Sequence, residues 1–168
     1  MNRSAGFTLV EFLVYLGIVS VSLTLVTTLA SALVQTEARG GVRETVDASA
    51  SRVLTQIAES MRAATAINTA DSIFGVSPGR LSLTMRDPLR SPTLFTVSAG
   101  RVEVSEGGGA PTPLTAETVD VTGFHLTRLN PANAKEGIQI TLTADFRTSG
   151  TDPQFQFSHT YVTGVVLH

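Results

Sequence analysis

The chain divides into three stretches by the spacing of its apolar residues. The first is continuously apolar, since 23 residues from Phe12 to Val34 carry no formal charge. In the second, from Val42 to Ile67, apolar residues recur at three-, four- and seven-residue steps, which is the helical period. From Arg80 onward the spacing becomes two, which is typical of half-buried strands. The pattern predicts an α+β fold, with a long N-terminal helix packed on an antiparallel β-sheet domain.

The uncharged stretch is long enough to cross a membrane, because about 20 apolar residues in a helix span the roughly 30 Å hydrocarbon core of a bilayer. One carboxylate, Glu11, stands at its beginning. A charge beside such a stretch costs free energy, so an ionisable residue there is a functional hypothesis that calls for a partner. The simpler interpretation is a charge at the membrane interface with no role of its own.

The second stretch predicts an amphipathic continuation of the helix. Its apolar stripe comprises Val42, Val46, Val53, Ile57, Met61 and Ala64, widened by Leu54 and Ile67. Charged residues occupy the other sides, where we expect them to face water, and the stripe is expected to pack against a sheet. Gly40 and Gly41 interrupt this helix at a cost of about 1 kcal/mol each relative to alanine, which makes them a candidate hinge or a mild bend.

The third stretch predicts five or six strands, arranged as a meander-like sheet or a pair of sheets. Two of them flank Ser98-Ala99-Gly100 and should form a tight hairpin. A third has a disturbance at Gly123, and the segment from Phe155 to Leu167 is interrupted at Gly164. The expected strands cover residues 81–85, 94–97, 101–104, 119–129, 138–145 and 155–167.

Two general interpretations compete for the N-terminus. A secretory signal peptide needs a basic start, a short apolar core and a small-residue cleavage site. Arg3 and Ala30-Ser31-Ala32 fit the first and last of these, but the uncharged stretch is too long and Glu11 is out of place. A plain membrane anchor fits the length and agrees with a cytoplasmic N-terminus, yet it gives no reason for Glu11.

The segment Gly6-Phe7-Thr8-Leu9-Val10-Glu11 follows a short polar leader with one arginine. This arrangement resembles the class III signal of type IV pilins and pseudopilins. The resemblance implies that a prepilin peptidase cuts between Gly6 and Phe7 and that Phe7 becomes the N-methylated terminus. Glu11 would then be the fifth residue of the mature chain, where the family's glutamate is thought to neutralise the N-terminal ammonium of a neighbouring subunit during assembly.

The chain departs from major pilins in one respect, because no proline precedes Pro78. Thr27 and Thr28 stand roughly where major pilins carry a helix-breaking proline, so the helix should be continuous there. The chain thus resembles minor subunits, such as J-type pseudopilins of type II secretion and W-type minor pilins. The implied organisation is a leader at 1–6, a transmembrane and filament-core helix at 7–34, its amphipathic continuation at 35–67 and a β-rich domain at 68–168.

The composition of the chain argues against nucleic-acid binding, metal binding and enzyme activity. The net charge is −2 and Lys135 is the single lysine, so no basic surface for nucleic acid is expected. The chain has no cysteine, and His125, His159 and His168 lack any metal-ligand spacing. The acidic residues are scattered rather than clustered, as a calcium site would require. We therefore expect no enzyme activity, cofactor or metal.

The resemblance implies a structural subunit of a type IV pilus or type II secretion pseudopilus. Its partners would be other pilins, prepilin peptidase, an inner-membrane assembly platform and, before assembly, membrane lipid. It would cross the inner membrane once, with an extracytoplasmic C-terminal domain, and then enter the filament. The alternatives are a single-pass membrane-anchored extracytoplasmic binding protein that forms no filament, and a membrane-tethered enzyme, which would need convergent polar groups in a pocket of the β domain.

Overall fold

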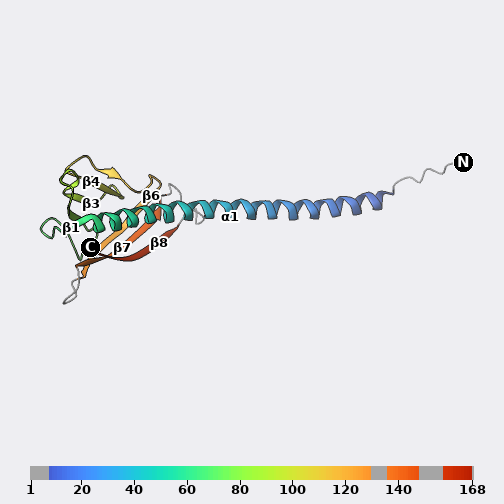
Figure 1. Ribbon diagram of the computed structural model, residues 1–168. Helices are drawn as coiled ribbons and strands as arrows, with labels where there is room; N and C mark the ends of the chain where they lie inside the picture. Colours follow the sequence, from blue (N-terminus) through green and yellow to red (C-terminus); the bar gives the residue numbers. More distant parts are fainter. Residues whose placement is uncertain (1–7, 130–135, 148–156, 168) are drawn as a thin grey trace. The chain divides into compact units, whose positions relative to one another are not determined.

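The computed structural model describes residues 8–129, 136–147 and 157–167, with the backbone alone at 33–39. The chain forms two compact units, Met1–Gly40 and Gly41–His168, which are considered separately below. The division falls between the two glycines that the sequence marks as a candidate hinge. The α+β class predicted from the spacing of apolar residues is confirmed (Figure 1).

Helix α1 runs from Leu9 to Ala63 without a break in its secondary structure. It passes through Thr27-Thr28 as predicted, and through Gly40-Gly41, where a Cβ atom on either glycine would meet nothing within 4 Å. The expectation that the helix reaches residue 67 is wrong. Strand β1, Ala64–Ile67, follows the helix directly and pairs with β2, because the backbone groups of this segment find partners in the sheet.

The strands form two antiparallel sheets, as the pattern allowed. The first contains β1, β2 (Leu81–Met85), β3 (Thr93–Ser98), β4 (Arg101–Glu106) and β5 (Thr112–Pro113) in that order. The second contains β6 (Val119–Leu129), β7 (Gly137–Phe146) and β8 (Ser158–Val166). A 3-10 helix, η1 (Pro88–Arg90), lies between β2 and β3. Strands β1 and β5 were not predicted, and β8 continues through Gly164 rather than ending there.

Two local predictions are confirmed. The β3–β4 hairpin turns at Ala99 and Gly100, whose φ angles of 48° and 72° are the positive values that a tight hairpin turn of this kind requires. The disturbance at Gly123 is a register shift in the pairing of β6 with β7, between Val121 and Gly123. Phe155, expected at the start of the last strand, lies outside the described residues.

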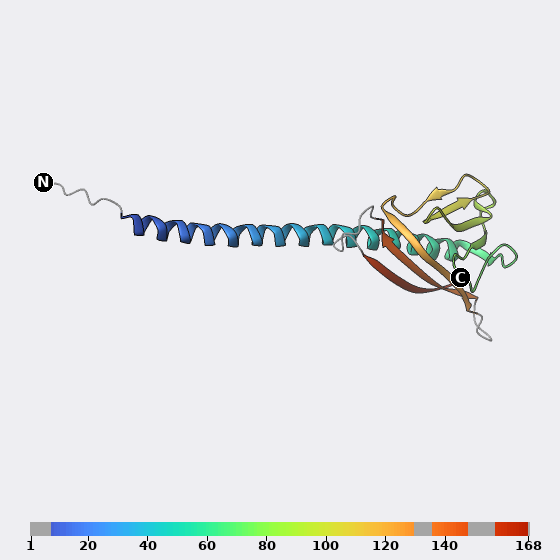
Figure 2. The ribbon, with the colours of Figure 1, turned by 180° about the vertical axis from the view of Figure 1, so that it is seen from behind.

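The apolar stripe of α1 forms the centre of the core. All six residues predicted for the stripe are buried, and Val46, Val53, Ile57 and Met61 have no exposed surface. Both views show the C-terminal part of α1 lying across β6, β7 and β8 (Figures 1 and 2). The side chains that pack around the helix come from both sheets and include Leu81, Leu83, Phe95, Phe124, Leu126, Ile138, Ile140 and Leu142.

The hairpin turn of the first sheet is fastened to the second sheet. Arg147, just after β7, donates from Nη2 to the Ala99 carbonyl at 3.2 Å and to Asp120 Oδ1 at 3.1 Å. The Val121 amide donates to the Gly100 carbonyl at 2.7 Å. These bonds hold the tip of the β3–β4 hairpin against the first residues of β6.

Gly100 should therefore resist substitution more than an open glycine does. A Cβ at Gly100 would lie 1.7 Å from Asp120 Oδ1, and the positive φ alone costs an alanine about 1–2 kcal/mol. We expect Gly100→Ala to lower the free energy of unfolding by at least that amount, measured by denaturant titration. Gly164→Ala is the matched control, because its Cβ would meet nothing within 4 Å; equal losses in the two variants would contradict the tether.

Candidate functional site

The described part of the predicted site begins at Thr8, which caps α1. The Glu11 amide donates to Thr8 Oγ1 at 3.2 Å, and the Phe12 amide donates to the Thr8 carbonyl at 3.2 Å. A threonine followed three residues later by glutamate is the sequence signature of a helix-capping box. Thr8 was not singled out by the sequence analysis, although this signature could have identified it. Gly6 and Phe7 lie outside the described residues.

From Leu9 to Ala32, α1 has a mean hydropathy of 2.2 and none of this segment is buried. Its large apolar side chains expose between 52% and 76% of their surface. A helix that is apolar all round needs apolar surroundings, which are either lipid or other helices. These side chains are Leu9, Val10, Phe12, Leu13, Val14, Tyr15, Leu16, Ile18, Val19, Val21, Leu23, Leu25, Val26 and Leu29.

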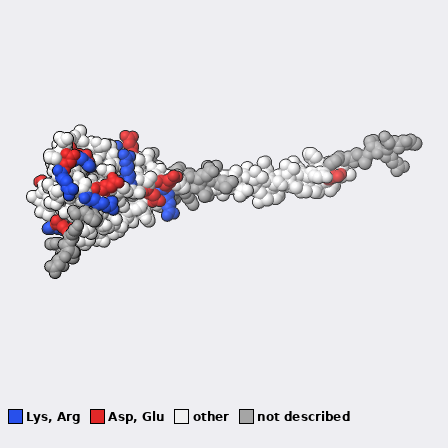
Figure 3. Space-filling model, in the orientation of Figure 1, with Lys and Arg blue, Asp and Glu red and all other residues white. Residues whose placement is uncertain are grey.

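Glu11 is exposed in the first turn of α1. The amide groups at a helix N-terminus favour a carboxylate there by roughly 0.3–1 kcal/mol. That gain is smaller than the cost of a few kcal/mol for a charge in apolar surroundings. Within residues 8–32 no other side chain carries a formal charge, so a cation for Glu11 has to come from outside this segment (Figure 3).

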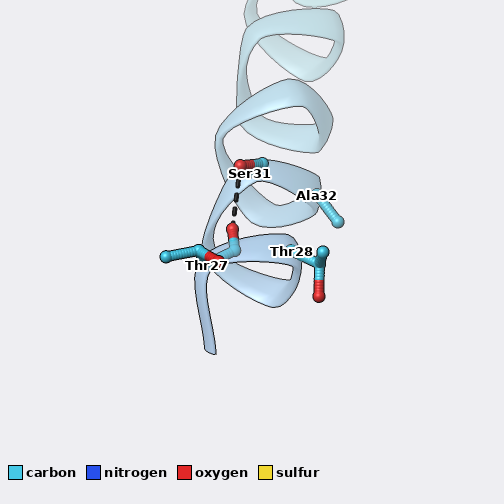
Figure 4. Close-up of a pocket in the computed structure, with 4 residues that line it drawn as sticks. All are labelled: Thr27, Thr28, Ser31 and Ala32. Atoms are coloured by element: carbon cyan, nitrogen blue, oxygen red, sulfur yellow. Dashed lines mark hydrogen bonds between the residues drawn. The ribbon is translucent and has the colours of Figure 1, made fainter. Parts of the chain in front are cut away.

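Several hydroxyl groups in the segment from Leu9 to Ala32 bond to the backbone of the helix itself. Five of them donate to a carbonyl three or four residues earlier, at 2.7–3.0 Å; the donors are Ser20, Thr24, Thr27, Thr28 and Ser31. Figure 4 shows the bond from Ser31 to the Thr27 carbonyl beside a shallow depression that these two residues line with Thr28 and Ala32. Hydroxyls bonded in this way can enter an apolar environment at little cost.

In the globular unit, α1 is joined to β8 by a small polar cluster. The Tyr161 hydroxyl donates to Asp47 Oδ1, and Asp47 also pairs with Arg43 at 3.6 Å. The Arg43 guanidinium lies 5.9 Å from the centre of the Phe157 ring. The side chains of Arg43 and Asp47 are 67% and 44% exposed, so they face water as expected, and they also contact Phe157 and Tyr161.

The described histidines and acidic residues form no metal site. His125 lies on β6 and His159 on β8, with β7 between the two strands, and His168 is outside the described residues. No group of three or more residues able to hold a metal is found in the described part of the chain. Several acids instead have local partners: Glu106 pairs with Arg90 at 2.6 Å, and Asp87 caps η1.

A pocket of about 290 Å³ lies in the globular unit where β7 ends and β8 begins. It is lined by Asp145, Phe146, Phe157 and Ser158, which bring together one carboxylate, one hydroxyl and two aromatic rings. A membrane-tethered enzyme would need a richer set of convergent polar groups. The described lining residues therefore give that alternative no support.

Tyr161 makes a pH-dependent contribution to stability. Burial first, and then the hydrogen bond to Asp47, raises the pKa of its hydroxyl above the ordinary value. Because the unfolded pKa is about 10, the folded chain retains this proton at a pH where the unfolded chain loses it, so stability should fall as the pH rises above about 10.

Comparing the wild type with Tyr161→Phe by thermal unfolding in detergent tests this. The variant should be less stable near neutral pH by about 1 kcal/mol, and the difference should shrink above about pH 10. Both proteins retain Tyr15, the other of the two tyrosines, so its titration cancels. A difference that stays constant with pH would show that Tyr161 does not titrate in this way.

Comparison with known protein families gives one match. Residues 1–27 match the family model described as the prokaryotic N-terminal methylation motif. This motif is the hallmark of type IV pilins and pseudopilins, and the match includes Gly6, Phe7 and Glu11. No curated protein and no solved structure matches the chain.

Proposed function

We propose that this chain is a minor pilin or pseudopilin, a structural subunit of a type IV pilus or type II secretion pseudopilus. The premise is that it carries a pilin-type N-terminal methylation motif on an apolar helix. The observation that carries the proposal is the single carboxylate in the first turn of this otherwise uncharged and fully exposed segment. An apolar surface of this kind is stable only when lipid or other helices cover it. Its one charge, on Glu11, has no cationic partner within residues 8–32.

Processing would supply the missing cation. Hydrolysis of the Gly6–Phe7 peptide bond by prepilin peptidase creates a new N-terminal ammonium, and a methyl group is then added to the Phe7 nitrogen. An N-methylated amine keeps its positive charge at neutral pH. The ammonium of one subunit can therefore pair with Glu11 of another, and such a pair is tolerated in an apolar filament core where either charge alone is not.

The capping by Thr8 is consistent with this arrangement. After cleavage Thr8 is the second residue of the mature chain, and its side chain still accepts the Glu11 amide. The helix can therefore begin within one turn of the new terminus, which leaves the ammonium close to the helix end and free to reach a neighbour. A minor, non-enzymatic role fits a continuous helix without proline and a globular unit whose described residues form no recognised catalytic set.

The proposal places the chain in the inner membrane, which it crosses once before assembly, with the C-terminal domain on the extracytoplasmic side. Its partners would be other pilins or pseudopilins, prepilin peptidase, the assembly platform and membrane lipid. The competing function is an anchored binding protein that forms no filament. The mature N-terminus separates the two, because only the pilin requires a chain that begins with N-methylated Phe7.

Replacing Gly6 with leucine should leave the leader attached, because a bulky side chain at the cleavage site blocks the peptidase. Mass spectrometry of the membrane-bound protein should find Met1 to Gly6 removed and Phe7 methylated in the wild type only. Gly17→Ala is the control, since its Cβ would meet nothing within 4 Å and it lies beyond the cleavage site. Normal cleavage of Gly6→Leu would overturn the processing site.

Replacing Glu11 with glutamine removes the charge while keeping the size of the side chain. Membrane insertion and leader cleavage should remain, whereas incorporation into sheared filaments should fall by about tenfold or more, which corresponds to a lost interaction of at least about 1.4 kcal/mol. Glu44→Gln, an exposed acid of α1 in the globular unit, is the matched control. Equal incorporation of Glu11→Gln and wild type would refute the assembly role of this carboxylate.

A further inference from the structure

The carboxylate of Asp145, near the end of β7, has no partner among the described residues. Its Oδ1 atom is buried, and no described group donates a hydrogen bond to it. The ion pairs of the described residues do not include Asp145 either. A buried acceptor without a partner costs free energy, and the cost is larger for a charged group. A cationic donor at this position would remove that cost.

The charges around Asp145 add to this demand. In the pairing of β6 with β7, Asp120 is directly opposite Asp145, and two like charges in this arrangement destabilise a sheet. Arg147 bonds to Asp120 at 3.1 Å. Arg101, on the hairpin that contacts β6, pairs with Glu117 at 3.7 Å. Both guanidinium groups are therefore committed to other acids, and the negative charge of Asp145 is not balanced by either of them.

Asp145 lines the pocket of about 290 Å³ where β7 ends and β8 begins. Phe146 and Phe157 form the apolar part of the lining, and Ser158 adds a hydroxyl. The Phe146 amide donates to the Phe157 carbonyl at 2.9 Å, and both side chains pack against a small core cluster that includes Val46. The lining is thus held in place before any ligand arrives, which favours binding.

These lining groups match an organic cation. Aromatic rings attract ammonium and guanidinium groups, and the carboxylate supplies the opposite charge. An anion would be repelled by Asp145 and Asp120, and a purely apolar group would leave the carboxylate without a partner. A calcium ion is a poorer match, because it takes six to eight oxygen ligands and the described residues contain no group of three or more residues able to hold a metal.

We propose that this pocket receives the guanidinium group of an arginine side chain from a partner protein. A guanidinium group is weakly hydrated, stacks on aromatic rings and can bond both oxygens of one carboxylate, whereas an ammonium group is strongly hydrated and acts as a point charge. Ligand pockets usually enclose about 300–1,000 Å³. The present volume is just below that range, so it suits one side chain rather than a larger ligand.

The globular unit already contains one arrangement of this kind. The guanidinium group of Arg43 lies 5.9 Å from the centre of the Phe157 ring and pairs with Asp47 at 3.6 Å. Arg43 is not among the described residues that line the pocket. The proposed contact would repeat this combination of arginine, aromatic ring and aspartate with Asp145 as the acid.

The charges favour an arginine within a protein over free arginine. Free arginine would bring its own carboxylate toward Asp145 and Asp120, whereas an arginine within a chain carries only the charge of its side chain. The contact lies in the globular unit and goes beyond the proposed function, because it requires neither leader cleavage nor the pairing of Glu11.

Titration of the full chain in an uncharged detergent with N-acetyl-arginine amide, followed by ligand-observed NMR, tests this contact. The matched probe is N-acetyl-citrulline amide, which keeps the shape of the side chain without its charge. The arginine probe should bind about tenfold more tightly than the citrulline probe, and Asp145→Asn should lose about tenfold in affinity for it. Glu103→Gln, which changes an acid on β4 of the first sheet, should bind like the wild type.

The Asp145→Asn variant should fold, because it removes a like charge opposite Asp120, and its thermal unfolding midpoint should equal or exceed that of the wild type. No binding of the arginine probe to the wild type, equal affinity for Asp145→Asn, equal binding of the citrulline probe, or displacement of the arginine probe by an equal concentration of calcium chloride would each overturn the proposal. Tighter binding of free arginine than of the blocked form would overturn the assignment to a partner protein. Leader cleavage, scored in the same samples, reports the proposed function separately.

Discussion

The globular unit depends on the burial of one apolar stripe of α1. Val53, Ile57 and Met61 are fully buried among side chains from both sheets, and α1 is the one α-helix among the described residues of this unit. Burying an aliphatic side chain of this size stabilises a fold by about 1.5–3 kcal/mol, so a few helical turns supply much of the driving force. Both sheets cover this part of the helix, and the apolar residues on their inward faces pack against its stripe.

The first part of the same helix is under the opposite constraint. Its large side chains are apolar on every side, five of its hydroxyls bond to their own backbone, and Glu11 is the only formal charge in residues 8–32. A segment of this kind is stable only when something apolar surrounds it. In the proposed filament, the amino terminus of a processed neighbour would supply the cation that Glu11 lacks within residues 8–32.

Much of this architecture was predictable because it rests on periodicity. The stripe of α1, the hairpin at Ala99-Gly100 and the register shift at Gly123 each follow from the spacing of apolar residues or from a glycine. The motif at residues 1–27 could also be recognised from the sequence, since its residues are contiguous. What could not be predicted depends on partners distant in sequence. Strand β1 was assigned to the helix because Ala64 and Ile67 fit the helical period, and only pairing with β2 decides the matter.

The contact of Asp47 with Tyr161 was hidden for the same reason, since the two residues are 114 positions apart. Because the Tyr161 hydroxyl and the Phe157 ring meet residues of α1, β8 is held on the helix from its inward face, while its outer edge and outward face stay unoccupied by described residues. The contacts that complete the core thus also hold the outermost strand of the second sheet on the helix.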